Sequence, residues 1–168
     1  AVSILLSALL LAGCKEQKAD VPAPDTPPVS TPSGAQPKLQ TIKLYIGDQV
    51  MEAELAIRPK EITTGMMFRT NMAENEGMLF IFQTPHRASF WMKNTSIPLS
   101  AAYINPDGII EEIHPLEPLN TNAVVAKSSN IQYVLETPQG WFDRHNIPTG
   151  SVIRTERGSL PETFFHRQ

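Results

Sequence analysis

Residues 41–57 read TIKLYIGDQVMEAELAI and predict a β-hairpin. Ile42, Leu44 and Ile46 alternate with more polar residues, and the same alternation returns after Gly47-Asp48. A period of two places the apolar side chains on one face of a strand, and Gly-Asp is suited to the connecting turn. This stretch therefore predicts the start of a β-sheet.

Short segments of the same kind continue to about residue 160. Residues 78–82 are apolar on both faces, which is typical of a central strand. Residues 100–104 and 109–114 flank Asn105-Pro106-Asp107-Gly108, a turn signal that predicts a second hairpin. Further strands are expected at residues 89–94, 131–136 and 151–155. Many short strands with little helix predict a small, compact α+β domain, mostly β, that is barrel-like or sandwich-like.

Few helices are expected between these strands. Pro59 suits a first helical position, and the apolar residues after it predict a short helix near Gly65. Thr137-Pro138 predicts the start of another, over Trp141 and Phe142. The domain is therefore expected to contain one or two short helices.

The N-terminus has the pattern of a secretory signal. Residues 4–12 form an apolar run that is far shorter than the roughly 20 residues that span a bilayer. Such a run followed by small residues is typical of a signal peptide, which we place at residues 1–13. The sequence begins at Ala1 without a basic segment before the run, so a few residues are expected to be missing from its start.

Leu11-Ala12-Gly13-Cys14 resembles the lipobox of bacterial lipoproteins, in which the cysteine is acylated and becomes the new N-terminus. The resemblance implies an exported protein, anchored through Cys14 at the periplasmic face of a bacterial membrane. Lys15 rather than Asp follows, which implies the outer membrane if the source is Gram-negative. The alternative is an ordinary core cysteine. Cys14 is the only cysteine in the chain, so no intramolecular disulfide can form.

Residues 14–38 are expected to form a disordered tether that begins with the lipidated cysteine. Large apolar side chains are almost absent, so the segment cannot bury enough surface to offset its ordering entropy. Proline favours an extended chain, and the segment contains Pro22, Pro24, Pro27, Pro28, Pro32 and Pro37. Residues 39–168 are expected to form a single β-rich globular domain.

The charge balance argues against nucleic acid as a partner. The chain of 168 residues carries 14 Lys and Arg against 17 Asp and Glu, which leaves no basic surplus to neutralise phosphates. No nucleotide-binding or hydrolase motif is present. The histidines lack the spacing of metal ligands, and they are His86, His114, His145 and His166. Neither a cofactor nor a metal is therefore expected.

Three segments carry a resemblance to a known family, and they are Gly65-Met66-Met67-Phe68-Arg69, Glu76-Gly77-Met78-Leu79-Phe80 and Phe90-Trp91-Met92-Lys93-Asn94-Thr95 with the following Ile97-Pro98-Leu99. They are similar to the bacterial and archaeal family of domain of unknown function 192, over roughly residues 40–156. The resemblance implies a compact, mostly β domain that is often exported or lipid-anchored, without an established activity. Members usually have Asp after Ile-Pro-Leu, whereas this chain has Ser100.

The predicted ligand site is centred on Trp91. Alternation along a strand places Trp91 and Lys93 on the face opposite Phe90 and Met92. An aromatic ring beside a cation and the amide of Asn94 could stack on a sugar and bind its polar groups. The alternative is that Trp91 is buried in the core and Lys93 lies over it.

Arg69 and Glu76 complete the predicted ligand-binding set. They flank residues 70–75, which are rich in turn-forming residues, and an ion pair between them is expected to hold this loop. Anion binding by Arg69 is the alternative.

These features favour a membrane-anchored envelope lipoprotein whose domain binds a small polar or glycan-like ligand, or a protein partner, rather than an enzyme. The alternative is an envelope hydrolase in which Glu136 or Glu76 acts with His145. Glu111 and Glu112 point to opposite faces of a strand, so they are expected to form a solvated rim rather than a catalytic pair. The sequence identifies no catalytic residue.

Overall fold

The computed structural model describes residues 32–165, which belong to one compact unit. The expected signal peptide, Cys14 and most of the expected tether lie outside these residues. The elements in chain order are β1 (Thr41–Ile46), β2 (Gln49–Ala56), α1 (Pro59–Thr64), β3 (Glu76–His86), β4 (Ser89–Phe90), β5 (Leu99–Ile104), β6 (Ile110–Leu116), β7 (Val124–Val125), β8 (Ile131–Pro138), α2 (Trp141–Arg144), β9 (Ile153–Thr155), β10 (Gly158–Ser159) and α3 (Leu160–Phe164). Within residues 32–165, no helix is long and apolar enough to cross a membrane.

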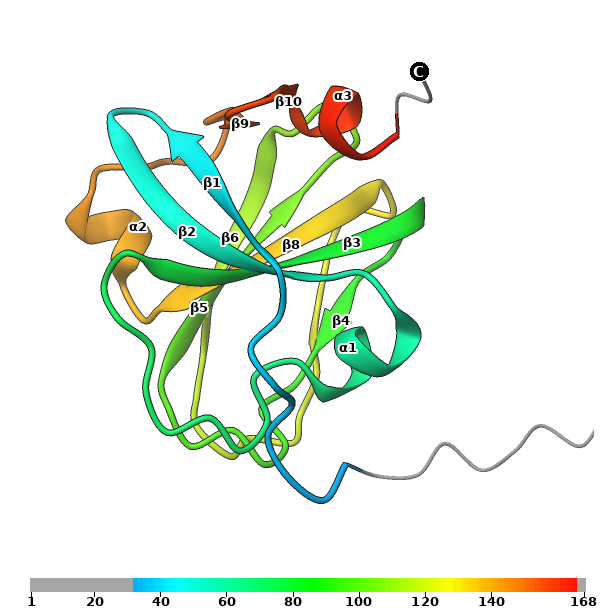
Figure 1. Cartoon of the computed structure of the whole chain (residues 1–168), viewed down its shortest axis with the longest axis vertical. Helices are drawn as coiled ribbons and strands as arrows, with labels where there is room; N and C mark the ends of the chain where they lie inside the picture. The colour runs from blue at the N-terminus through cyan, green and yellow to red at the C-terminus, as the bar shows by residue number, and fades with distance from the viewer. Residues whose placement is uncertain (1–31, 166–168) are drawn as a thin grey trace, which may run out of the picture. The chain divides into compact units, whose positions relative to one another are not determined.

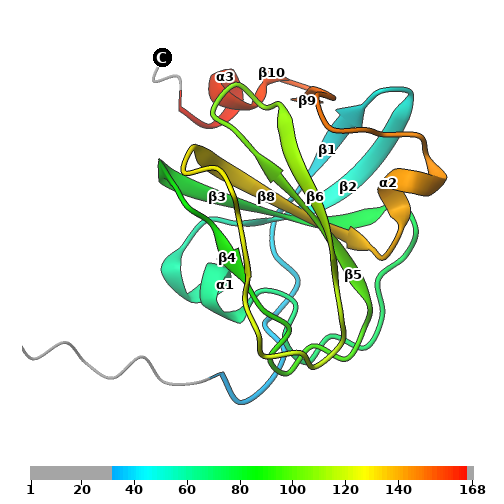
Figure 2. The ribbon, with the colours of Figure 1, turned by 180° about the vertical axis from the view of Figure 1, so that it is seen from behind.

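One mixed sheet organises the domain, with eight strands in the order β10-β9-β1-β2-β3-β8-β5-β6 (Figure 1). Its neighbouring strands are antiparallel except β2 and β3, which run parallel. α1 lies in the connection between these two, because a parallel pair needs a crossover rather than a tight turn. β4 pairs with β7 in a separate ribbon, and both views place β4 beside α1 (Figures 1 and 2).

The sheet curls until segments near its two edges meet. The amide of Gly150 donates to the Ile110 carbonyl over 2.8 Å, and the amide of Ile110 donates to the Ser151 carbonyl over 3.0 Å. Ile109 and Val152 form an isolated bridge. These bonds do not continue as a ladder, so the sheet is not closed into a barrel. The predicted class, α+β and mostly β, is confirmed.

Apolar side chains pack on both faces of the sheet, in two clusters. Leu44 and Trp141 belong to the first cluster, and Phe80 and Met92 to the second. Along β8, Leu135 packs in the first cluster and its neighbours in the strand face the other way. The side chain at position 136 is therefore directed to the second face.

The structure confirms both predicted hairpins, β1 with β2 and β5 with β6. α1 also matches its prediction, since it starts at Pro59 and ends before Gly65. The described residues contain three short helices rather than one or two, because Ser159 and Glu162 form a capping box that starts α3. The strand expected over residues 89–94 is wrong beyond Phe90, where β4 ends and the chain enters a turn.

Candidate functional site

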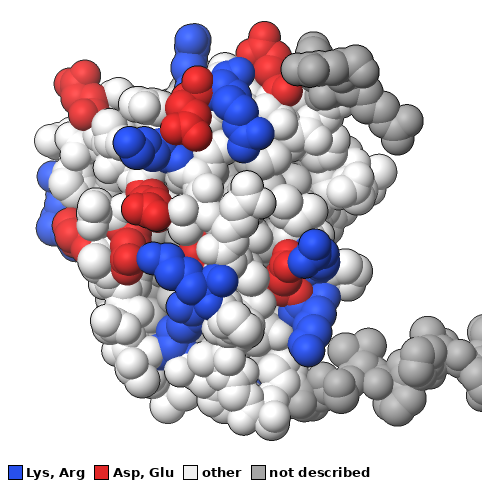
Figure 3. All heavy atoms as spheres, viewed as in Figure 1, with Lys and Arg blue, Asp and Glu red and all other residues white. Residues whose placement is uncertain are grey.

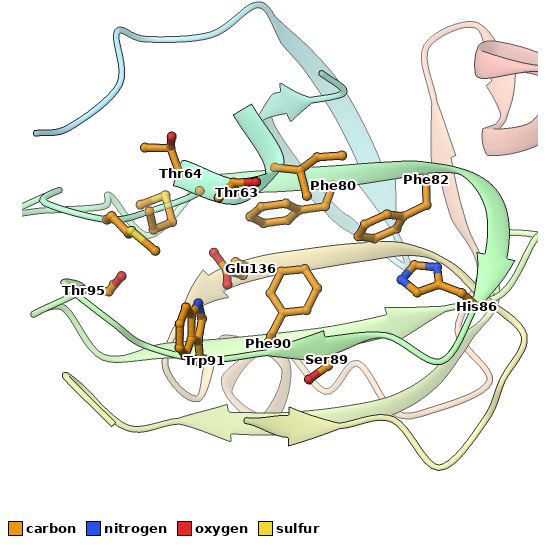
Figure 4. A pocket seen from close by; sticks show the side chains of 14 residues that line it. Thr63, Thr64, Phe80, Phe82, His86, Ser89, Phe90, Trp91, Thr95 and Glu136 are labelled. Carbon is orange, nitrogen blue, oxygen red and sulfur yellow. The ribbon is translucent and has the colours of Figure 1, made fainter. Parts of the chain in front are cut away.

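A cavity of about 220 Å³ lies beside α1 and β4, on the second face of the sheet. α1, β3, β8 and the segment around β4 supply its walls (Figure 4). Its lining residues are Ile62, Thr63, Thr64, Gly65, Met66, Met67, Phe80, Phe82, His86, Ser89, Phe90, Trp91, Thr95 and Glu136. Pockets for drug-sized ligands usually measure roughly 300–1,000 Å³, so this cavity suits a small ligand.

Glu136 is the one carboxyl among the described residues that line the cavity. It is 3% exposed, and its Oε2 has no hydrogen-bond partner in the described part of the chain. The carboxyl lies among the rings of Phe80, Phe90 and Trp91 (Figure 4). Leaving a buried polar atom unsatisfied costs about 1–3 kcal/mol, and such an atom in a native protein calls for an explanation. A ligand that supplies the missing partner is one such explanation.

Burial controls the ionisation of Glu136. Removal from water raises its pKa from the ordinary 4.5 to about 8, because the charged form loses its hydration. No Lys or Arg among the described residues lines the cavity to offset this effect. The carboxyl is therefore mostly protonated at neutral pH, with its charge available only when a partner stabilises it.

Tyr103 on β5 also responds to this environment. Its burial, together with the nearby charges of Glu136 and Glu112, raises the pKa of the phenol. The hydroxyl donates to the Val124 carbonyl over 2.6 Å. Tyr103 therefore stays protonated, and its hydroxyl hydrogen is used in the bond to Val124.

Aromatic rings form much of the cavity wall. Phe80 and Phe90 meet edge to face with ring centroids 4.9 Å apart, and Phe82 lies 4.4 Å from the His86 ring. Trp91 is 47% exposed, so it forms the outer part of the wall. The alternative in which Trp91 is buried in the core is wrong, because the chain leaves β4 one residue earlier and Trp91 follows outside the ribbon. Its other part is correct, since Lys93 lies over the Trp91 ring.

Of the five predicted ligand residues, only Trp91 lines this cavity. Lys93 touches the site indirectly, since its Nζ lies 5.3 Å from the centroid of the Trp91 ring. Asn94 adopts a left-handed backbone with φ 56°, and its carbonyl accepts a hydrogen bond from the amide of Phe68 over 2.7 Å. Its backbone thus links the turn at the end of this segment to the segment after α1.

Arg69 and Glu76 lie together at a second depression of about 190 Å³, which shares Met66 with the first. The ion pair expected between them is wrong. Arg69 Nη2 lies 3.0 Å from Oε2 of Glu54, and Glu76 Oε1 lies 3.7 Å from Nζ of Lys38. Glu54 is the more buried carboxylate, with a side chain 13% exposed against 43% for Glu76, so it has more need of the guanidinium.

Glu76 nevertheless holds the loop that precedes it. Its Oε2 accepts a hydrogen bond from the amide of Ala73 over 3.0 Å. The expected role is therefore fulfilled through the backbone rather than through Arg69.

The residues of the predicted hydrolase are not brought together. Glu136 lies in the first cavity and Glu76 at the second depression. His145 Nε2 lies 3.1 Å from Oε1 of Glu74, and its ring lies 4.6 Å from that of Trp141. His145 therefore contacts Glu74 at the surface and packs against Trp141. His166 lies outside the described residues.

Glu112 is not part of a solvated rim. Its side chain is 10% exposed, and its Oε2 lies 2.8 Å from Nε2 of His114. Its Oε1 accepts hydrogen bonds from the amides of Lys127 and Ser128. These two amides need an acceptor, and they hold the Glu112 side chain against the 127–128 segment instead of in solvent.

Ser100 is hydrogen-bonded outside the cavity, and the described residues offer no metal-binding group. Ser100 Oγ accepts a hydrogen bond from the amide of Gly140 over 2.9 Å, and the residue does not line the cavity. Ser100 therefore holds the backbone at Gly140 and takes no part in the cavity wall. Within residues 32–165, no group of three His, Cys, Asp or Glu residues could hold a metal ion.

The described residues thus form a curled, mostly β sheet with a small cavity around a buried carboxyl. The chain belongs to the DUF192 family, described as "Uncharacterized ACR", whose profile matches residues 42–155. The resemblance seen in the sequence is thus confirmed. No match was found among curated proteins.

Two solved structures are similar to the chain. A candidate transcription regulator from Sinorhizobium meliloti is 28% identical, with a TM-score of 0.68, over 72% of this chain and 98% of that one. A protein of unknown function from Novosphingobium aromaticivorans is 31% identical, with a TM-score of 0.66, over 84% of this chain and 99% of that one. Each match extends over almost the whole length of the other protein.

The sequence prediction missed most of the cavity wall. Phe80 and Phe82 were expected only as parts of a central strand, and Glu136 only as a catalytic alternative. The available signal was the composition of β8, an apolar strand that carries Glu136 near its end. A carboxyl in such a strand is either at an edge or buried for a reason, and the strand order decides between these.

Proposed function

We propose that this domain binds a small polar ligand in the cell envelope, in the cavity between Trp91 and Glu136. The main support is the buried Glu136 Oε2, which lacks a hydrogen-bond partner among the described residues. A bound hydrogen-bond partner would remove the cost of that unsatisfied atom. The half-exposed ring of Trp91 would cover the ligand on the outer side.

The size and charge of the domain support a small ligand over a polymer. A cavity of about 220 Å³ has no room for an extended glycan. The net charge of −3 gives no general attraction to nucleic acid, and Figure 3 shows charges of both signs interspersed on the face in view. A protein partner would have to use a surface other than this cavity.

The proposal places the protein on a lipid anchor at Cys14, at the periplasmic face of a bacterial membrane. The support is the Leu11-Ala12-Gly13-Cys14 motif behind an apolar run. In a bacterium fed a labelled fatty acid, the wild-type protein should incorporate label and the Cys14→Ala variant should not. The matched control, Lys15→Ala, keeps the acceptor thiol and should remain labelled. Equal labelling of the wild type and Cys14→Ala would contradict the anchor.

A thermal-shift screen of the purified protein tests the ligand site. Small amines, organic acids, simple sugars and peptidoglycan fragments are suitable compounds. A ligand that binds the folded state raises Tm by mass action, and this rise should disappear in Glu136→Gln and Trp91→Ala.

The matched control for the aromatic substitution is Tyr45→Ala. Tyr45 is 39% exposed on β1 and does not line the cavity, so this variant should keep the full response. Stabilisation that survives both cavity variants would show that the ligand binds elsewhere.

An envelope hydrolase is the second candidate, because a carboxyl that is protonated near neutral pH can act as a general acid. Glu136 meets that condition. Glycoside hydrolysis also needs a second carboxyl about 5–9.5 Å away, and the described lining residues provide only Glu136. Binding requires fewer groups and is the preferred function.

A further inference from the structure

The walls of the cavity are rich in electrons and poor in positive charge. The rings of Phe90 and Trp91 and the thioethers of Met66 and Met67 line it, whereas no Lys or Arg among the described residues does. Aromatic faces attract organic cations. An anionic ligand would find no Lys or Arg in the described wall to offset the cost of leaving water.

Two of the hydroxyl groups in the wall donate their hydrogens to the backbone. Thr64 Oγ1 donates to the Lys60 carbonyl over 2.8 Å, and Thr95 Oγ1 donates to the Lys93 carbonyl over 3.4 Å. A hydroxyl that donates elsewhere keeps only its acceptor capacity. These two hydroxyl oxygens can therefore only accept a hydrogen bond from a ligand.

Glu136 adds the strongest of these acceptors when it is ionised, and Oε2 is the buried oxygen without a partner. We infer that the cavity recognises a small ligand through an organic ammonium group, which donates to the Glu136 carboxylate and lies against the rings of Phe90 and Trp91. This inference rests on the proposed function and specifies its ligand class.

The protein itself shows that the Trp91 ring accepts an ammonium group. The Nζ of Lys93 lies 5.3 Å from its centroid, within the range of a cation–π contact. The ring can therefore take part in such a contact.

Binding should exchange one proton with the solvent. The Glu136 carboxyl loses its proton as the ion pair forms, and the ligand keeps its charge. Ammonium affinity should therefore rise by up to about tenfold per pH unit below the carboxyl's pKa of about 8 and then level off. A primary alkylammonium remains charged to about pH 10, so the plateau is accessible.

Three probes of one shape test the inference on the full chain: neopentylammonium, neopentyl alcohol and pivalate. Binding is followed by the NMR shift of the Trp91 indole N–H. Near pH 8.5, the ammonium should bind at least about tenfold more tightly than the alcohol, and pivalate should bind most weakly. Glu136→Gln should abolish the preference for the ammonium, whose affinity should fall to about that of the alcohol.

Variants of the other ionisable groups near Glu136 test whether those groups cause the pH dependence of ammonium binding. They are His86 in the cavity wall, Lys93 over Trp91 and Tyr103 on β5. The pH slope should persist in His86→Gln and Lys93→Met. Tyr103 stays protonated over this range because its pKa is raised. Loss of the slope in either variant, with its retention in Glu136→Gln, would overturn the inference.

The outcomes separate the ligand class from the site. If the alcohol or pivalate binds more tightly than the ammonium, and Glu136→Gln weakens it, the ammonium inference is overturned while the proposed binding site stands. If no probe shifts the Trp91 signal, the ammonium inference is also overturned, and the broader thermal-shift screen decides the proposed function.

Discussion

Replacing Glu136 with Gln should remove a large pH dependence of stability. The pKa of the folded carboxyl is about 8, against 4.5 for its ordinary value, so between these pH values the folded state holds a proton that the unfolded state has lost. This contribution to stability is fully present below pH 4.5 and is lost as the pH rises to about 8. The slope reaches about 1.4 kcal/mol per pH unit, for a total on the order of 4–5 kcal/mol.

Urea unfolding of both proteins between about pH 5 and about pH 9 measures this effect. The difference between the two free energies of unfolding should change steadily up to about pH 8 and then become constant. The comparison uses slopes rather than absolute values, because the new amide has its own hydrogen-bonding needs. Parallel curves for the two proteins would contradict a raised pKa for Glu136.

Replacement by alanine should lower the free energy of unfolding strongly at Trp141 and only slightly at Trp91. Trp141 is 2% exposed in the first cluster, with its ring centroid 5.2 Å from that of Phe142. Trp141→Ala removes a large buried ring and should lower the free energy of unfolding by about 3–5 kcal/mol. This is a large part of the roughly 5–15 kcal/mol that holds a domain together.

Trp91→Ala is the control, because Trp91 is 47% exposed at the cavity. It should change the free energy of unfolding by less than about 1 kcal/mol and abolish ligand stabilisation. Urea unfolding of both variants checks the first part. Equal losses of stability would contradict the assignment of Trp141 to the core and Trp91 to the site.

Local patterns were sufficient to predict much of the fold. The β1–β2 and β5–β6 hairpins follow from alternation and from turn residues, because neighbouring strands joined by a tight turn pair with each other. α3 carried a usable signal in Ser159 and Glu162, which have the spacing of a capping box. Strand order was out of reach, since period-two patterns do not say which distant strand lies beside β8.

The candidate site was only partly predictable for the same reason. Trp91 stood out as an aromatic residue beside a cation, and it does line the cavity. The importance of Glu136 depends on the position of β8 between β3 and β5, a long-range feature. The wrong pairing of Arg69 has a related cause, because its partner Glu54 comes from β2, distant in the sequence.

The most direct test of the account is an NMR titration of the Glu136 carboxyl in the folded protein without ligand. Isotope-labelled glutamate provides the signal, and its absence from the spectrum of Glu136→Gln assigns it. We expect a midpoint at about pH 8. A midpoint near the ordinary value of 4.5 would mean that the carboxyl is hydrated or already paired, and it would contradict the central claim that the cavity holds an unpartnered acid for a ligand.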